Sequence, residues 1–142
     1  MDDQRQLHEG NMAITSGVHH IGLTVSRLEE SASFFTDLLD WKEVRRNLAY
    51  PAIYVSDGTA MVTLWAAKEE PPAQFDRRRN VGLHHVALRV GRESALTSLH
   101  SKLRDAGVEI EFAPEQVGSG PAMHMICREP SGIRVEFIWP GD

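Results

Sequence analysis

An internal duplication is the feature of this sequence that most constrains its fold. Residues 19–25, HHIGLTV, recur about 65 positions later as residues 84–90, HHVALRV. A helical pattern follows each copy, and each half closes on an apolar run that ends in tryptophan, VTLW at 62–65 and EFIW at 136–139. Repetition of this kind indicates one supersecondary unit used twice. Because units of this size would each bury a small core, we expect the two to share one.

The order of elements predicts the motif βαβββ in each half. Ser26, with Glu29 three residues later, is typical of a helix start, and an apolar face follows, made by Leu28, Phe34, Phe35, Leu38 and Leu39. A second helix is predicted over 94–106, ended by Gly107. Strands are expected after the helices at 52–55, 60–65, 108–112, 122–128 and 133–139. The prediction is an α+β fold whose paired modules form a curved mixed sheet around a metal-binding cavity.

The module boundaries follow from the repeat and from the charged, proline-containing segment between its copies. We expect an N-terminal tail at 1–17, a first module at 18–66, a linker at 67–82 and a second module at 83–142, together one domain. The linker contains the triplet Arg77-Arg78-Arg79, which is interpreted as a solvated segment rather than an anion site.

Composition excludes several classes of protein. The 15 basic and 20 acidic residues give a net charge of −5, which argues against a nucleic-acid partner. No apolar run approaches the ~20 residues of a membrane span, and the polar start has no signal core, so a cytoplasmic protein is expected. The single cysteine, Cys127, cannot form an intrachain disulfide and is expected to be a buried strand residue rather than a nucleophile.

Strand alternation places three potential metal ligands on equivalent faces. If Ile21, Leu23 and Val25 face a helix, His20 lies on the opposite side, and the same alternation places His85 opposite Val86. In the last strand, Glu136 lies opposite Val135, Phe137 and Trp139. Two imidazoles and one carboxylate are the donor set of a facial triad for a divalent first-row metal. The alternative is that all three are simply polar residues on sheet surfaces.

Four segments carry a resemblance to a known family: HIGLTV at 20–25, SFFTDLL at 33–39, HVALRV at 85–90 and EPSGIRVE at 129–136. In this order, with the duplication, the chain resembles the vicinal oxygen chelate superfamily from residue 18 to residue 140. That superfamily includes glyoxalases, extradiol dioxygenases, fosfomycin-modifying enzymes and bleomycin-resistance proteins. The resemblance implies that His20, His85 and Glu136 hold one divalent metal per site, of the group Fe, Mn, Co, Ni or Zn.

The chain departs from that family at two positions. Lactoylglutathione lyases take a fourth ligand, a carboxylate, from the last strand of the first module. Aligning the terminal tryptophans places Val62 there, so the resemblance favours the three-ligand dioxygenase and fosfomycin branches. Asp40 stands where the family usually has glycine after the first helix, and is expected in the left-handed conformation.

Further candidates surround the expected cavity. His124 and Tyr54 are candidate catalytic groups, and Arg89 and Tyr50 are candidate substrate contacts. His19 and His84 are interpreted as packing or capping residues at the strand ends. His100 is expected on the surface of the second helix.

The sequence therefore predicts a metal-dependent enzyme that acts on a small-molecule substrate by lyase or isomerase, group-transfer or dioxygenase chemistry. The alternative is a metal-free ligand-binding protein of the bleomycin-resistance type. We expect a homodimer whose cavity combines His20 of one chain with His85 and Glu136 of the other, with no nucleic-acid or membrane partner.

Overall fold

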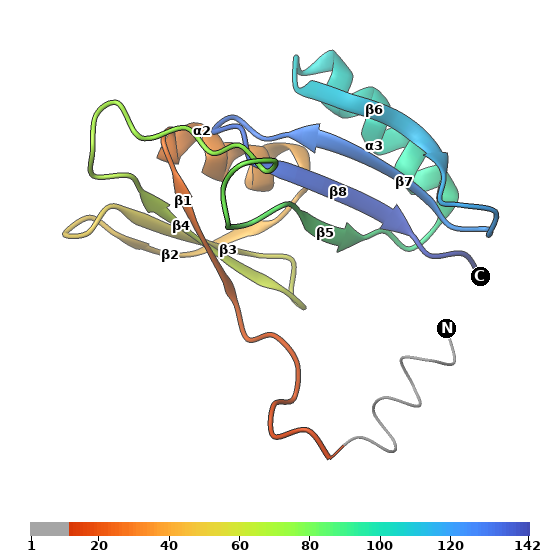
Figure 1. Ribbon diagram of the computed structural model, residues 1–142, viewed down its shortest axis with the longest axis horizontal. Helices are drawn as coiled ribbons and strands as arrows, with labels where there is room; N and C mark the ends of the chain where they lie inside the picture. The colour runs from red at the N-terminus through yellow and green to blue at the C-terminus, as the bar shows by residue number, and fades with distance from the viewer. Residues whose placement is uncertain (1–11) are drawn as a thin grey trace.

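The computed structural model describes residues 12–142, so the first eleven residues of the predicted tail lie outside the described residues. Two consecutive βαβββ modules make up the described chain (Figure 1). The elements of the first are β1 (Ile21–Val25), α2 (Leu28–Ser33), the π-helical turn η1 (Phe34–Leu38), β2 (Lys42–Asn47), β3 (Ala52–Ser56) and β4 (Met61–Ala66). Those of the second are β5 (Val86–Arg89), α3 (Glu93–Asp105), β6 (Glu109–Gln116), β7 (Met123–Arg128) and β8 (Arg134–Trp139).

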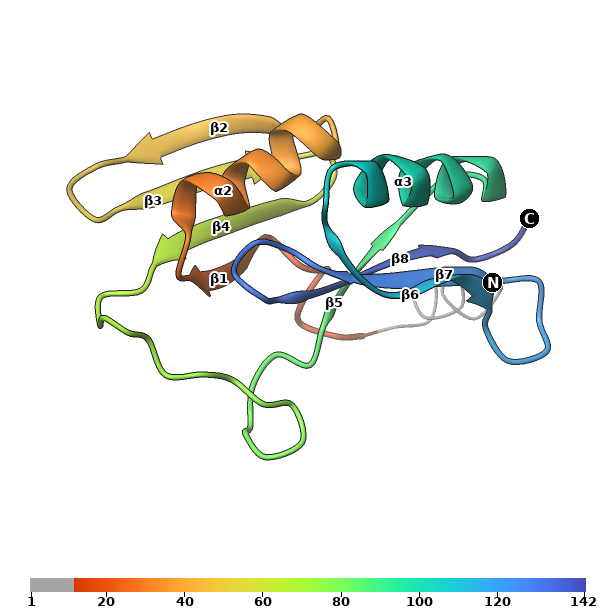
Figure 2. The ribbon, with the colours of Figure 1, turned by 90° about the horizontal axis from the view of Figure 1, so that it is seen from above.

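Each module forms its own four-stranded mixed sheet, with the same strand order. The first sheet runs β1-β4-β3-β2 and the second β5-β8-β7-β6. In both, the first strand lies parallel to the last, and the remaining pairs are antiparallel. Within the described chain the two sheets are separate (Figures 1 and 2). The predicted α+β architecture of paired βαβββ modules is confirmed.

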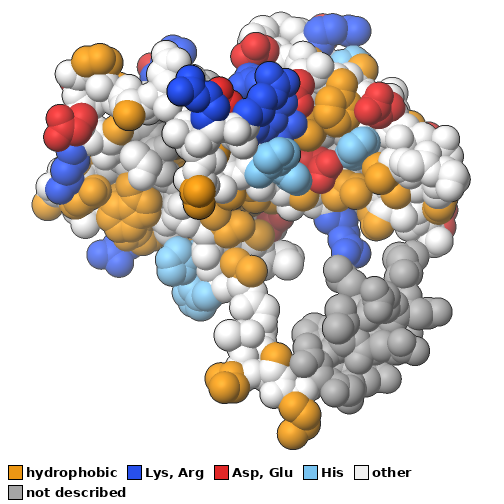
Figure 3. Space-filling model, in the orientation of Figure 1, with side chains coloured by type: hydrophobic (Ala, Val, Ile, Leu, Met, Phe, Trp, Pro, Cys, Tyr) orange, Lys and Arg blue, Asp and Glu red, His pale blue; other side chains and the backbone are white. Residues whose placement is uncertain are grey.

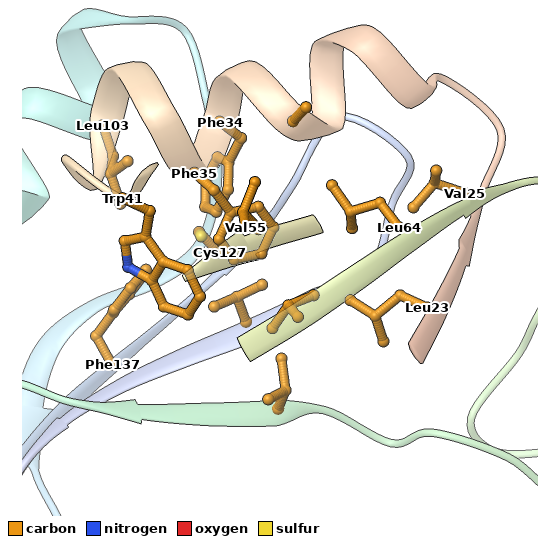
Figure 4. Packing of buried hydrophobic residues seen from close by; sticks show 14 of the residues in the cluster. Leu23, Val25, Phe34, Phe35, Trp41, Val55, Leu64, Leu103, Cys127 and Phe137 are labelled. Atoms are coloured by element: carbon orange, nitrogen blue, oxygen red, sulfur yellow. The ribbon is translucent and has the colours of Figure 1, made fainter. Parts of the chain in front are cut away.

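The two modules share one hydrophobic core, as the small size of each module requires. It is built from the helix-facing side chains of both sheets and from residues of α2, η1 and α3, with Leu64, Phe35, Leu96 and Val135 almost completely buried. Figure 4 shows Trp41 of the first module between Leu103 and Phe137 of the second. Burial across the module boundary means that neither half has its complete core alone.

A buried polar contact also joins the modules. Glu129, in the turn between β7 and β8, has only 2% of its surface exposed and accepts a hydrogen bond of 2.5 Å from Ser31 Oγ of α2. Its other oxygen accepts from the backbone N–H groups of Ser131 and Ile133. Burial, the strongest influence, raises the pKa of this carboxyl, although each hydrogen bond lowers it.

The structure tests the predictions for the start of the first helix, the strand that follows it and Asp40. The first helix begins at Leu28 behind Arg27, whose side chain makes no capping hydrogen bond, so the cap assigned to Ser26 is wrong by one residue. The strand β2 was counted in the motif but not located, because its sequence KEVRRN is almost entirely polar and exposed. Asp40 has a φ of 59°, which confirms its left-handed conformation.

The segment between β4 and β5 runs outside both sheets (Figure 2). In residues 12–142, no helix has the length and apolar character needed to cross a membrane.

Candidate functional site

The helix-distal face of the second sheet holds the candidate site. Glu136 lies on the central strand β8, directly across from Ala87 of β5 and Ile126 of β7. His124 lies two residues before Ile126 and shares its face, while His85 immediately precedes β5. Val135 and Phe137, the neighbours of Glu136 in sequence, are buried in the core, as strand alternation predicts.

Both carboxylate oxygens of Glu136 face histidines. His124 Nδ1 lies 2.7 Å from Oε2, within hydrogen-bond distance, and His85 Nε2 lies 3.7 Å from Oε1. The Glu136 side chain is only 14% exposed, so this carboxylate is held in place rather than solvated. The other ring nitrogen of His124 lies 3.8 Å from Glu115 Oε1, and the ring packs on Phe112 with centroids 4.9 Å apart.

A chain of hydrogen bonds determines which nitrogen of His85 carries its proton. Arg134 Nη1 donates to the His84 carbonyl at 3.2 Å and lies 3.1 Å from His84 Nδ1, to which a guanidinium can only donate. His84 Nδ1 is also 2.8 Å from His85 Nδ1, so one of these two nitrogens carries the proton between the rings; if His84 Nδ1 accepts from Arg134, that nitrogen is His85 Nδ1. In that tautomer, His85 Nε2, 3.7 Å from Glu136 Oε1, is unprotonated, which is the form that binds a metal.

Arg134 is itself fixed by an acidic residue on β6, the edge strand of the same sheet beyond β7. Its Nη2 lies 2.6 Å from Glu111 Oε2 and its Nε 3.0 Å from Oε1, a bidentate pair to which Arg128 adds a contact of 3.2 Å. The hydrogen bond from Arg134 lowers the pKa of Glu111 and, in turn, the bond to Glu111 raises that of Arg134. Desolvation, followed by the charge of Arg134, lowers the pKa of His84 and so favours its neutral form.

The pair His85 and Glu136 is compatible with a divalent metal. Nε2 and Oε1 lie closer together, at 3.7 Å, than twice a metal–ligand bond of ~2.1 Å, so one ion can contact both atoms. One open carboxylate oxygen and one unprotonated imidazole nitrogen would supply two of the three ligands of a facial triad. The hydrogen bond from His124 leaves that open oxygen free while it orients the carboxylate.

The third expected ligand, His20, lies elsewhere in the chain. It precedes β1 in the first module, and its ring contacts His19, with 2.9 Å between the two Nδ1 atoms. Among residues 12–142, no three His, Cys, Asp or Glu side chains gather as a metal-binding group. In Figure 3, histidine side chains lie on both sides of an acidic side chain, and other histidines lie well apart from them. A single chain therefore presents only part of the expected triad.

The alignment of Val62 with Glu136 is wrong by one residue. The pairs Ile21 with Val62 and Gly22 with Thr63 in the first module correspond to Val86 with Val135 and Ala87 with Glu136 in the second. Thr63 is therefore the counterpart of Glu136, and Val62 is a core residue with 1% of its surface exposed. The two terminal tryptophans are not at equivalent positions of their strands, so aligning them shifts the register by one residue. Such a shift exchanges the two faces of the strand.

The other candidate residues fall into two groups. Tyr50 and Tyr54 surround Trp65 on the first sheet, with ring centroids 5.1 Å and 6.0 Å from the indole. Arg89 is exposed on β5, opposite Ile138 and on the face of Glu136. Cys127 is buried, and burial raises the pKa of its thiol to about 12, which confirms an unreactive core residue.

Sequence reasoning missed His84, Arg134 and Glu111. His84 was interpreted as a packing residue, but it is exposed and lies between Arg134 and His85. The available signal was the repeated His-His pair itself: His19 and His20 form the same edge-to-face contact as His84 and His85.

Comparisons with known proteins agree with this architecture. The family model described as the Glyoxalase/Bleomycin resistance protein/Dioxygenase superfamily matches residues 17–137. Similar solved structures include a glyoxylase/bleomycin resistance protein/dioxygenase domain from Frankia sp. EAN1pec, which is 26% identical with a TM-score of 0.77; the match covers 89% of this chain and 98% of that one. No curated protein matches this chain at a significant level.

Two more distant structures show the same fold. A lactoylglutathione lyase from Agrobacterium tumefaciens is 16% identical, with a TM-score of 0.70 and coverage of 89% of this chain and 96% of that one. The fosfomycin resistance protein FosX from Listeria monocytogenes is 13% identical, with a TM-score of 0.68 and coverage of 89% and 94%.

Proposed function

The chain belongs to the Glyoxalase/Bleomycin resistance protein/Dioxygenase superfamily, and we propose that it is a divalent-metal-dependent enzyme acting on a small molecule. The observation that carries the proposal is the arrangement of His85 and Glu136, whose facing atoms lie 3.7 Å apart. The contacts from Arg134 to His84 and from His84 to His85 support a tautomer in which His85 Nε2 is unprotonated. Histidines that bind metals usually have their tautomer fixed by a hydrogen bond to the other ring nitrogen, whereas solvated surface histidines do not need one.

The third ligand of this site is His20 of a second copy of the chain. His85 and Glu136 lie on one sheet of the chain and His20 beside the other, so a two-fold dimer can bring the two sheets of different chains together. Each dimer then has two equivalent sites, and every site takes one module from each chain. The same arrangement joins the two sheets into the expected cavity.

When bound, the cation would act as a Lewis acid that chelates two neighbouring oxygens of the substrate. The protein's own groups prepare this site: His124 orients Glu136 through Oε2, and Arg134 sets the tautomer of His85 through His84. Arg89, exposed on the same face, would bind an anionic part of the substrate, and Tyr54 of the other module would line the opposite wall of the proposed cavity.

The number of protein ligands favours some reaction classes over others. With Thr63 where lactoylglutathione lyases supply a carboxylate, the site offers three protein ligands and leaves more positions open. This favours group addition, as in fosfomycin resistance, or dioxygenation over isomerisation of a glutathione adduct. Iron would serve the dioxygenase reaction, and Mn, Co, Ni or Zn the others.

Subunit mixing tests the ligand set and the crossed assembly together. His20→Ala and Glu136→Ala proteins, each metal-poor alone, are mixed in equal amounts under conditions of subunit exchange, and metal content is measured after removal of free metal. Half the dimers become hybrids, and each hybrid has one site free of both substitutions, so about a quarter of all sites should recover metal. The matched control mixes His85→Ala with Glu136→Ala, where every site keeps one substitution and nothing recovers.

Three outcomes separate the possibilities. Recovery only in the first mixture supports the proposal. No recovery after verified exchange rejects the crossed arrangement. If the wild-type protein takes up no divalent metal, the proposal of a metal-dependent enzyme is rejected. The alternative, a metal-free binding protein of the bleomycin-resistance type, is then supported.

A further inference from the structure

Three aromatic side chains form a continuous group on the first sheet. Tyr50, in the turn between β2 and β3, packs its ring edge-to-face on Trp65, with centroids 5.1 Å apart, and Tyr54 packs on the same indole at 6.0 Å. Trp65 and Tyr54 are half-buried and Tyr50 is exposed, so the group presents ring surface to solvent. Hydrophobic side chains gather over the region of β2, β3 and β4 in Figure 3.

Register places this aromatic group on the same sheet face as His20, with Trp65 level with Thr24, four residues further along the chain. Trp65 pairs with Thr24 of β1, and Gly22 pairs with Thr63, so all four residues share the face on which His20 precedes the strand. The Trp65 Nε1–H donates a hydrogen bond of 2.8 Å to Thr63 Oγ1, which fixes the indole. A Cβ at Gly22 would lie 3.4 Å from Trp65 Nε1 and 3.2 Å from Thr63 Oγ1, so glycine leaves room for the ring at this point.

Two cations border the aromatic group. Lys68 Nζ lies 4.0 Å from the centre of the Tyr50 ring, and Arg45 Cζ lies 5.6 Å from that of Tyr54. Among residues 12–142, neither has an ion pair with an acidic side chain. Arg46, the next residue, contrasts with Arg45: it lies on the helix side of β2 and is paired with Glu29 and Glu43.

We propose that the ligand of this cavity is an aromatic carboxylate, whose ring stacks on Tyr54 and Trp65 and whose anionic group faces Arg45 and Lys68. Ring faces attract other rings in offset or edge-to-face geometry, and cations without carboxylate partners attract an anion. This inference rests on the proposed function, since the aromatic group becomes a cavity wall only when the second sheet of another copy faces it. It identifies the substrate class of that site.

Calorimetric titration with three related probes tests the inference: 2-naphthoate, its saturated analogue decahydro-2-naphthoate, and the neutral 2-naphthylmethanol. The wild-type protein should bind 2-naphthoate roughly three- to tenfold more tightly than either of the other two. Tyr50→Leu and Trp65→Leu should both reduce the preference for the aromatic ring. Because Tyr50 is exposed in a turn, its substitution should leave the fold intact. Arg45→Gln should reduce the preference for the carboxylate, whereas the matched control Arg46→Gln should leave it unchanged.

Each titration is made with protein treated with EDTA and with protein loaded with Mn²⁺, and metal content is measured in both. Equal binding of 2-naphthoate and its saturated analogue, or equal effects of Arg45→Gln and Arg46→Gln, overturns the inference. Loss of selectivity with metal uptake intact overturns this inference alone. Retained selectivity in a protein that takes up no metal upholds the aromatic site and overturns only the metal-dependent function.

Discussion

Thr63 on β4 occupies the position in the first module that Glu136 occupies in the second. Thr63 pairs with Gly22 and Glu136 with Ala87, and these glycine and alanine residues are themselves repeat equivalents. The duplicated strands thus place a hydroxyl in one module where the other places a carboxylate. Thr63 lies on the same face as His20. A site shared by two modules therefore has one carboxylate ligand fewer than it would have with glutamate at position 63.

Restoring a carboxylate at this position should add a metal ligand. Thr63→Glu is expected to bind divalent metal at least tenfold more tightly than the wild type, since it supplies a fourth protein ligand at the crossed site. Competition with a chelator of known affinity measures the change. Val62→Glu is the matched control, because its side chain points into the core and should destabilise the fold by several kcal/mol without tighter metal binding. Equal metal affinity in Thr63→Glu and the wild type would contradict the assigned position of the site.

Substitution of Arg134 should weaken metal binding without any change in a ligand. Arg134→Lys is expected to lower metal affinity by about 10–100-fold, because a point charge cannot hold Glu111 and His84 together and the His85 tautomer is then no longer fixed. Arg128→Lys is the control: Arg128 also contacts Glu111, but at 3.2 Å and without reaching His84. Chelator competition measures the metal affinity of both variants. Equal losses of metal affinity would mean that Arg134 has only a structural role.

The local part of the site could be predicted from the sequence because strand alternation determines which side chains share a face. His85 and Glu136 were placed together by this reasoning, since Val86, Val135 and Phe137 leave no doubt about the buried side. The position of His20 could not be tested in the same way, because its expected partners belong to a second copy. Sequence alternation describes one sheet at a time and carries no information on which chain supplies the neighbouring sheet.

The register of β4 shows a second limit. The tryptophans at 65 and 139 look equivalent in sequence, yet Trp65 is the structural counterpart of Ile138, because both lie three residues after the start of the parallel pairing. Trp65 is on the open face with Tyr54, whereas Trp139 continues the alternation of Val135 and Phe137. Periodicity alone could not detect the shift, since Val62, Thr63 and Leu64 are all buried.

The single thiol should be inert in the folded protein. Burial is the main cause that raises the pKa of Cys127 to about 12, so almost no thiolate exists at pH 8. Reaction with Ellman's reagent should therefore be at least 100-fold slower in native protein than in urea-unfolded protein. Rapid modification of native protein would contradict the position of Cys127 in the shared core.

Glu129 should make the stability of the protein fall as pH rises from the acidic range towards neutrality. Its folded-state pKa is raised above the unfolded value, mainly by burial. The native state therefore binds this proton more tightly than the unfolded chain, and the stabilisation is complete below the unfolded pKa of ~4.3. It is lost as pH rises through the raised pKa. Glu111, whose pKa is lowered by Arg134, contributes in the opposite direction, since its stabilisation is lost on acidification.

Glu129→Gln isolates the first contribution because glutamine can keep all three hydrogen bonds. Both backbone N–H groups reach Oε1, which glutamine retains, and the new amide can donate to Ser31 Oγ, whose own hydroxyl is 2.7 Å from Ser131 Oγ. In urea unfolding between pH 4 and 8, the free energy of unfolding of the variant relative to the wild type should therefore increase with pH. Glu129→Ala, which leaves the same donors without an acceptor, should cost roughly 2–4 kcal/mol at pH 4 and less at higher pH, because only the wild type loses stabilisation as the buried carboxyl ionises. A constant difference between Glu129→Gln and the wild type across this range would mean that the buried carboxyl does not change its charge there.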